Sequence, residues 1–255
     1  MIKFFRHIRK RLLSENKFSK YVLYAIGEIV LVVIGILIAL WVNNWNEEHK
    51  ERQLGHDLLL RIQRDLVKDT VSFHADIVRN NTLRVDLKRV LVDLYDGIDG
   101  MDEVQAMSNT WDLLLDQAFS PNDNTYRSML SSGTLGFIHN TNLKEEILDL
   151  YSAYDQTQTL LLSISDWMIG IASNMDSETN FIKFGSTVSD IFTTHDMFNE
   201  DDYAFLNKKE SPEFKLFVRA LSSVAFYQKV NNSYRLALIE KCRVVLKSIE
   251  KELNT

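Results

Sequence analysis

Residues 21–42 read YVLYAIGEIVLVVIGILIALWV and contain one charged side chain, that of Glu28. At about 1.5 Å of rise per residue, a helix over this run reaches roughly 33 Å, which is enough to cross a hydrocarbon core of about 30 Å. The run therefore predicts a transmembrane helix. It divides the chain into a segment at 1–20, the span at 21–42 and a domain at 43–255.

The charges on either side of the span predict its orientation. Residues 1–20 contain seven Lys/Arg and one acidic residue and carry +6, whereas the whole chain carries −6, so residues 21–255 carry −12. Basic flanking residues stay on the cytoplasmic side of a membrane. We therefore expect the N-terminus inside and the C-terminal domain outside.

A cleaved signal peptide is the alternative to a membrane anchor. Its apolar core normally covers about 7–15 residues and ends at a small-residue cleavage site. Here the run is longer and ends in Leu40-Trp41-Val42, without such a site. Trp41 and Trp45 also suit the outer membrane interface, as Tyr21 suits the inner one. We expect an uncleaved signal anchor.

The first thirteen residues, MIKFFRHIRKRLL, predict a short basic amphipathic helix. Its basic side chains are Lys3, Arg6, Arg9, Lys10 and Arg11. Such a helix can bind the anionic inner leaflet of the bilayer. The alternative is that these charges only set the orientation of the span.

Composition predicts an all-α fold for residues 43–255. The whole chain has only two prolines, Pro121 and Pro212, and nine glycines, which is too few for a turn-rich β-sandwich or barrel. Apolar spacing predicts helices over 43–96, 102–119, 125–131, 142–174 and from Pro212 almost to the C-terminus. The expected architecture is therefore a transmembrane helix that continues into an elongated antiparallel helical bundle.

Two expected helix starts carry capping signals. Asn142 and Glu145 have the spacing of a capping box, and Ser211-Pro212-Glu213 combines a capping hydroxyl with proline and an acid in the first turn. The apolar residues after Asn142 keep a near-heptad rhythm, which is typical of coiled-coil packing.

The N-terminal sequence resembles a known family. Residues 1–47 are similar to the opening of a large uncharacterised family of single-pass proteins from Bacteroidota, most closely in SENK at 14–17, YAIGE at 24–28 and NNWN at 43–46. A looser match covers Thr125 to Tyr151. The resemblance implies a bacterial inner-membrane protein with a periplasmic helical domain, and it supplies no catalytic residues.

Motifs for catalysis or metal binding are not evident. The six histidines form no H-E-x-x-H pair, and the sequence contains no P-loop, G-x-S-x-G or dinucleotide-binding glycine pattern. The lone cysteine, Cys242, falls on the apolar stripe of the last helix, which predicts a buried thiol. We expect no enzyme activity and no cofactor.

Within the span, Glu28, Gly35 and Ala39 share one helix face. Gly35 and Ala39 have the small-x-x-x-small spacing that lets two membrane helices approach closely. This face predicts self-association or contact with the membrane helix of a partner. Two alternatives are that Glu28 reaches the inner interface, and that it takes part in proton transfer.

Two further sets of polar residues stand out in the outer domain. Gln228, Asn231 and Arg235 continue the apolar stripe of the last helix, so they predict a polar layer that sets helix register or lines a pocket. Tyr126, Arg127 and the turn at 131–133 could present backbone groups to a ligand, or could form an ordinary helix C-cap.

These features favour a membrane-anchored, non-catalytic protein for interaction or sensing. About 20 residues are expected inside, which is too few for a kinase, a cyclase or a nucleic-acid-binding domain on ordinary domain sizes. A signal would have to pass through a membrane or envelope partner. A structural or accessory subunit of an envelope complex is the second hypothesis, and a periplasmic enzyme is the third.

Overall fold

A computed structural model of the chain describes residues 18–114, 119–185, 188, 191 and 198–254. These residues form helices and connecting turns, with no β-strand among them, which confirms the all-α fold. They fall into two compact units, Met1–Gly55 and His56–Thr255. The elements are α2 (Phe18–Asp96), α3 (Met101–Leu114), α4 (Asn124–Ser132), α5 (Thr141–Thr179) and α6 (Pro212–Leu253), with short 3-10 helices η1 (Thr134–Phe137), η2 (Phe181–Phe184), η5 (Glu200–Asp202) and η6 (Ala204–Asn207).

The first unit consists of the N-terminal part of α2. Its apolar side chains from Ile29 to Val42 are exposed, and none of the apolar window is buried inside the protein. Among the described residues this is the helix that is long and apolar enough to cross a membrane, by length and composition. The five basic residues expected to contact the inner leaflet, at 3–11, lie outside the described residues.

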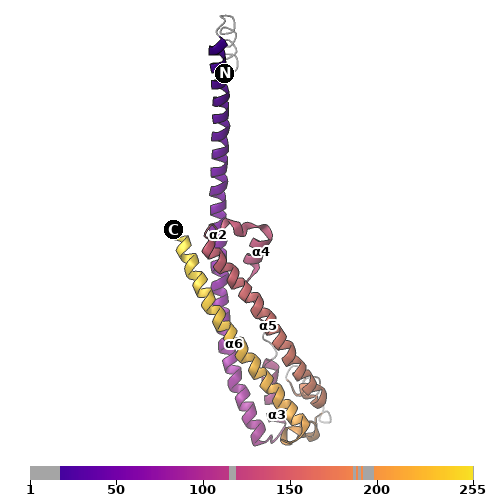
Figure 1. Ribbon diagram of the computed structural model, residues 1–255. Coiled ribbons are helices and arrows are strands. Elements are labelled where there is room, and N and C mark those ends of the chain that lie inside the picture. The colour runs from indigo at the N-terminus through magenta and orange to yellow at the C-terminus, as the bar shows by residue number, and fades with distance from the viewer. Residues whose placement is uncertain (1–17, 115–118, 186–187, 189–190, 192–197, 255) are drawn as a thin grey trace. The chain divides into compact units, whose positions relative to one another are not determined.

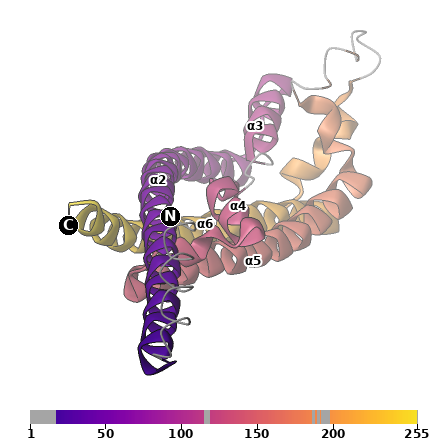
Figure 2. The ribbon, with the colours of Figure 1, turned by 90° about the horizontal axis from the view of Figure 1, so that it is seen from above.

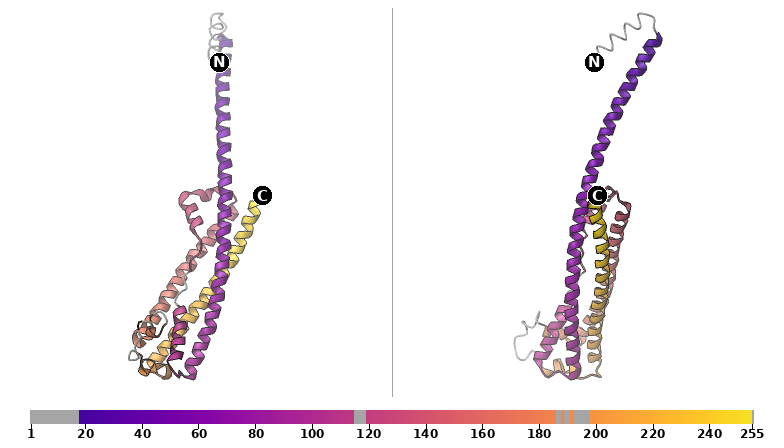
Figure 3. Two further views of the ribbon diagram at one scale, coloured as in Figure 1. Left: turned by 180° about the vertical axis from the view of Figure 1, so that it is seen from behind. Right: turned by 90° about the vertical axis from the view of Figure 1, so that its left-hand side faces the viewer.

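The second unit is a bundle in which α5 and α6 lie along the part of α2 that follows His56 (Figures 1 and 3). Residue numbers rise along α2 as they fall along α6: Asp76 contacts Arg235, and Asn80 contacts Asn232. Likewise, Asn140 of α5 contacts Glu252. Helix α6 is therefore antiparallel to both other helices, while α2 and α5 run in the same direction.

The parallel pair α2 and α5 requires a long return connection, which residues 97–140 supply. Asn122 in this connection bonds Asp69 of α2, and the hydroxyl of Thr125 bonds Asp65. These contacts hold the connection against α2, while Tyr126 of α4 stacks on Tyr151 of α5. Figure 2 shows α4 beside α5 in the view from above. The connection thus brings a turn back against the middle of the bundle.

The helix ends follow local chemistry. Ser211 accepts a hydrogen bond from the backbone N–H of Phe214, which confirms the predicted start of α6. The capping box predicted at Asn142 is wrong by two residues: Asn140 caps α5 by accepting from the N–H of Leu143 at 3.1 Å. Asn140 is preferred because it also donates to Glu252, which Asn142 does not do in the described contacts.

One other expected boundary differs from the structure. Helix α5 runs to Thr179, beyond the expected end near 174, because its apolar repeat continues through Met175. Helix α3 is described from Met101 to Leu114, and its expected continuation to Phe119 falls on residues 115–118, which lie outside the described part of the chain.

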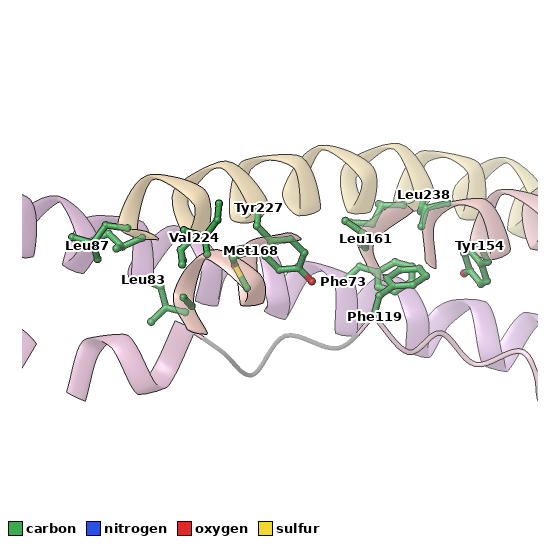
Figure 4. Close-up of a cluster of buried hydrophobic side chains, with 14 of the residues drawn as sticks. Phe73, Leu83, Leu87, Phe119, Tyr154, Leu161, Met168, Val224, Tyr227 and Leu238 are labelled. Atoms are coloured by element: carbon green, nitrogen blue, oxygen red, sulfur yellow. The ribbon is translucent and has the colours of Figure 1, made fainter. Parts of the chain in front are cut away.

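On the three long helices, buried residues recur along the sequence at a spacing of three or four residues. They run through Leu66, Asp69, Phe73, Asn80, Leu83, Leu87, Val90 and Leu94 on α2; Leu143, Ile147, Leu150, Tyr154, Thr157, Leu161, Met168, Ile171 and Met175 on α5; and Phe214, Phe217, Leu221, Val224, Gln228, Asn231, Arg235, Leu238, Cys242, Val245 and Ile249 on α6. Figure 4 shows apolar members of all three stripes meeting between the helices. The middle third is the exception, because polar residues occupy several of these inward positions.

Candidate functional site

Inward-facing polar side chains from all three long helices form what we call the polar seam. Its members are Asp69, Asp76 and Asn80 on α2, Tyr154 and Thr157 on α5, and Gln228, Asn231, Arg235 and Cys242 on α6. All are buried except Asp76, whose side chain is 23% exposed. Buried polar groups are costly unless they are hydrogen-bonded, so their partners decide what the seam can do.

One end of the seam is a connected hydrogen-bond network around Asp69. The carboxylate accepts from the backbone N–H of Asn122 at 2.9 Å, from the Asn122 amide at 2.7 Å and from the hydroxyl of Tyr154 at 2.9 Å. Since Tyr154 uses its one hydrogen on Asp69, the thiol of Cys242 donates to the Tyr154 oxygen, with 3.1 Å between sulfur and oxygen. The network joins α2, α5, α6 and the return connection.

Burial shifts the titration of this network. It raises the pKa of Asp69, and the hydrogen bonds from Asn122 and Tyr154 oppose that rise only in part. Burial also raises the pKa of Tyr154, and it raises that of Cys242 to about 11. Cys242 is therefore a neutral thiol near pH 7, which is the unreactive form. The prediction of a buried thiol is confirmed.

The other end of the seam centres on Arg235. Its Nε and Nη2 each lie 3.0 Å from Oδ2 of Asp76, and its guanidinium lies over the ring of Phe119, 5.5 Å from the ring centre. Burial lowers the pKa of Arg235, while Asp76 acts in the opposite direction. Asp76 also accepts a bond from Arg79 at 3.3 Å, so its charge is shared between two guanidinium groups.

Four polar atoms in this part of the seam have no hydrogen-bond partner among the described residues. They are Asn80 Oδ1, Arg235 Nη1 and both amide atoms of Gln228. The side chain of Asn231 hydrogen-bonds Tyr227. By contrast, the Asn80 amide donates to Asn232, which in turn donates to Asn81. Each unpaired buried group costs about 1–3 kcal/mol relative to the same group in water. Three of the four atoms lie on the inward face of α6, and the fourth lies on α2.

The chemistry of the seam follows from its hydrogen bonds. Tyr154 donates to Asp69 inside a buried network, and no group of three metal-ligating His, Cys, Asp or Glu side chains occurs among the residues that the structure describes. Chemically, the seam can fix helix register and can offer amide and guanidinium groups to a hydrogen-bonding ligand. The four unpaired atoms are closed off from solvent, so such binding requires the helices to separate.

Sequence reasoning identified Gln228, Asn231 and Arg235 but missed the acidic members of the seam, Asp69 and Asp76. Asp69 and Asp76 also occupy inward positions of α2, at three residues from Leu66 and Phe73, and that spacing was the available signal. Asn122 and Phe119 carried no such signal, because a long return connection brings them to the seam.

The other predicted site residues are not brought to the seam. In the first unit, Glu28 is half-buried and Ala39 is exposed, and a Cβ added at Gly35 would meet no described atom within 4 Å. The turn at 131–133 is a helix C-cap, in which Gly133 has φ 71°. Tyr126 stacks on Tyr151 with ring centres 4.1 Å apart.

The comparisons with known proteins give one match. No curated protein and no solved structure matches this chain. The model of a family of unknown function matches residues 28–208, from the apolar segment of α2 through η6. Because this match covers well over half of the sequence, the chain belongs to that family of unknown function, DUF6090.

Proposed function

We propose that this protein is a non-catalytic, membrane-anchored sensing or interaction protein whose helical bundle lies in the periplasm. The observation that carries the proposal is the set of four unpaired polar atoms in the polar seam. A bundle selected only as a rigid spacer would gain stability from apolar residues at these positions. Retaining Gln228 there favours a bundle that opens or repacks when it binds something.

The membrane part of the proposal rests on the apolar segment of α2 and on charge. Apolar side chains from Ile29 to Val42 are exposed to whatever surrounds the chain, as a bilayer would require. The contrast between +6 before the span and −12 after its start favours the N-terminus inside. The N-terminal resemblance to single-pass proteins of Bacteroidota favours the bacterial inner membrane and a signal anchor.

Sensing would act through movement of α6 against α2 and α5. Separation at the seam would hydrate the amides of Gln228 and Asn231 and expose Cys242, whereas the apolar layers on either side would stay packed. The regular spacing of the inward residues favours coiled-coil packing, in which small helix shifts are transmitted along the bundle. A partner in the membrane or envelope would receive that shift.

A structural or accessory subunit of an envelope complex is the alternative. It is favoured by the length of α5 and α6, 39 and 42 residues, which suits a spacer. In that case the polar seam would only fix the register of the helices. The two hypotheses differ in whether the seam responds to a bound molecule.

The test measures opening of the seam in the full chain, reconstituted in lipid nanodiscs. Cys242 is the only cysteine, so its rate of labelling by a thiol reagent reports exposure of the seam. A panel of periplasmic metabolites and peptides is screened for compounds that change this rate and shift the melting temperature. We expect at least one such compound, with its effect lost in Gln228→Leu and kept in the exposed control Gln156→Leu. If no compound in the panel changes either quantity, the sensing hypothesis fails and the accessory role is favoured.

A further inference from the structure

Four successive outermost positions of α2 in the bundle are occupied by valine. Where two inward positions of a long helix are four residues apart, the residue halfway between them points directly away from the core. On α5 these residues are polar: Glu145, Ser152, Thr159, Asp166 and Ser173. On α6 they are Arg219, Phe226, Ser233, Glu240 and Lys247, four of the five being polar. On α2 the first is Arg64, and the next four are Val71, Val78, Val85 and Val92, which we call the valine stripe.

The valine stripe is open to the surroundings. Val71, Val78, Val85 and Val92 are 65%, 66%, 60% and 49% exposed. Valine has lower helix propensity than Glu, Lys or Gln, and it gains nothing from burial at these positions. Neither helix formation nor core packing therefore explains why four successive outward positions carry the same apolar residue.

A spacing of seven residues is the repeat that a helix needs to stay in contact with another helix. Between the valines lie Ala75 and Thr82, whose small side chains permit close approach of a second helix. Arg89 is larger, but its side chain is 69% exposed and its long stem can lie beside a contact. The stripe therefore matches the surface of one helix against another over three heptads.

We propose that the valine stripe packs against the valine stripe of a second copy of this chain, with the two α2 helices parallel and in register. The parallel direction rests on the proposed function, because two copies anchored through the same N-terminal span enter the periplasm side by side. In this arrangement the charges of Lys88 and Asp93, which lie beside the stripe, are complementary. In a parallel pair of helices, a residue on one flank faces the residue five positions later on the other helix.

Three flanking contacts follow from that geometry, each made twice by symmetry. Lys88 faces Asp93 of the second copy, Asn81 faces Asp86, and His74 faces Arg79. Of these, the contact between Lys88 and Asp93 joins opposite charges. Lys88 and Asp93 are exposed and form no ion pair that competes with this contact within the described part of one chain. Opposite charges at such flanking positions select the partner and its direction. Confinement to one membrane raises the local concentration of both copies, so a contact of this modest size is sufficient.

Cysteine cross-linking in membranes tests the proposal directly. In a Cys242→Ser background, Val78→Cys and Val85→Cys are each expected to form a disulfide-linked dimer upon mild oxidation. A parallel, in-register pair places each cysteine opposite its own counterpart, within the Cα separation of about 4.4–6.8 Å that a disulfide requires. The matched control is Val244→Cys on α6, which replaces an equally exposed valine, 52%, outside the stripe.

Exchanging the charges of Lys88 and Asp93 is a second test of the parallel pairing of the two α2 helices. Lys88→Glu and Asp93→Lys should each weaken self-association of the full chain in detergent by about fivefold, because each puts like charges together. The double variant restores opposite charges and should recover the wild-type association constant. This recovery is not expected of a variant that merely perturbs the fold.

The outcomes separate this proposal from the proposed function. Cross-linking no greater than in Val244→Cys would overturn the stripe as a contact, while leaving the labelling response of Cys242 unaffected. Disulfides that form only in mixtures of Val78→Cys with Val85→Cys would overturn the parallel pairing, since an antiparallel pair brings those two positions together. Failure of the compound panel with intact cross-linking would instead overturn sensing and leave the dimer in place.

Discussion

At the scale of single residues, the buried carboxyl of Asp69 makes stability depend on pH. Its pKa is raised above the ordinary 3.8, mainly by burial. The folded chain therefore holds the proton more tightly than the unfolded chain does. The resulting contribution to stability is complete below 3.8 and is lost as the pH rises through the folded-state pKa.

This sign gives a prediction for Asp69→Asn. Wild-type protein should lose unfolding free energy as the pH rises from 3.8 towards neutrality through this group, and the variant should lack that component. Chemical unfolding of the full chain in detergent, measured across this range, checks it. Asp155→Asn, which replaces an exposed aspartate on α5, is the control. Identical pH profiles for Asp69→Asn and wild type would contradict the prediction.

Gln228 is a buried polar residue whose replacement by an apolar residue is expected to stabilise the protein. Both of its amide atoms lack partners among the described residues, so Gln228→Leu should raise the unfolding free energy by about 1–3 kcal/mol. The control Gln156→Leu, at an exposed position, should stay within about 0.5 kcal/mol of wild type. Denaturant titration measures both. A destabilised Gln228→Leu would mean that the amide has a partner worth keeping.

At the scale of helices, the start of α5 has two candidate N-cap residues, Asn140 and Asn142, and mutation can distinguish them. Asn140 accepts from the N–H of Leu143 and donates to Glu252, so Asn140→Ala should cost about 1 kcal/mol or more of unfolding free energy. Asn142 is exposed within the first turn, so Asn142→Ala should have almost no effect. The comparison of the two variants by denaturant unfolding checks the boundary. Equal losses in both would argue for the start expected from sequence.

The capping error shows what sequence reasoning could and could not supply. Local signals were sufficient where partners are near in the chain: Ser211 caps α6, and the apolar run of α2 ends at Asp96 before Gly97, which has φ 112°. At α5, two asparagines lie two residues apart, and the choice depends on Glu252, which is 112 residues away from Asn140. A local pattern cannot supply such a distant partner.

The polar seam likewise combines residues that local sequence identifies with residues that only the fold brings together. The inward spacing of α6 was sufficient to identify Gln228, Asn231 and Arg235 as a polar layer. The return connection over 97–140 then determines that Asn122 and Phe119 complete the layer. The direction of α5 relative to α2 follows from this connection too.

At the scale of the whole chain, the orientation that we propose rests on the basic residues before the apolar segment. Replacing Lys3, Arg6, Arg9, Lys10 and Arg11 with glutamine would reduce the charge of residues 1–20 from +6 to about +1 and remove most of the bias that retains this segment inside. Alkaline phosphatase fused to the C-terminus is active only outside the cytoplasm, so its activity per chain reports the direction of insertion. We expect that activity to fall severalfold in the five-residue variant, with a rise in the fluorescence of a matching C-terminal green fluorescent protein fusion.

The control for that experiment removes the same number of positive charges from the folded bundle. Positive charges far from a span contribute little to its orientation. Exposed residues of the second unit serve this purpose: Lys208, Arg219, Lys229, Lys241 and Lys247. Their replacement by glutamine should leave phosphatase activity per chain unchanged. Equal activity in both five-residue variants would mean that the N-terminal charges do not determine orientation, and the basic segment would then be assigned to binding the anionic inner leaflet.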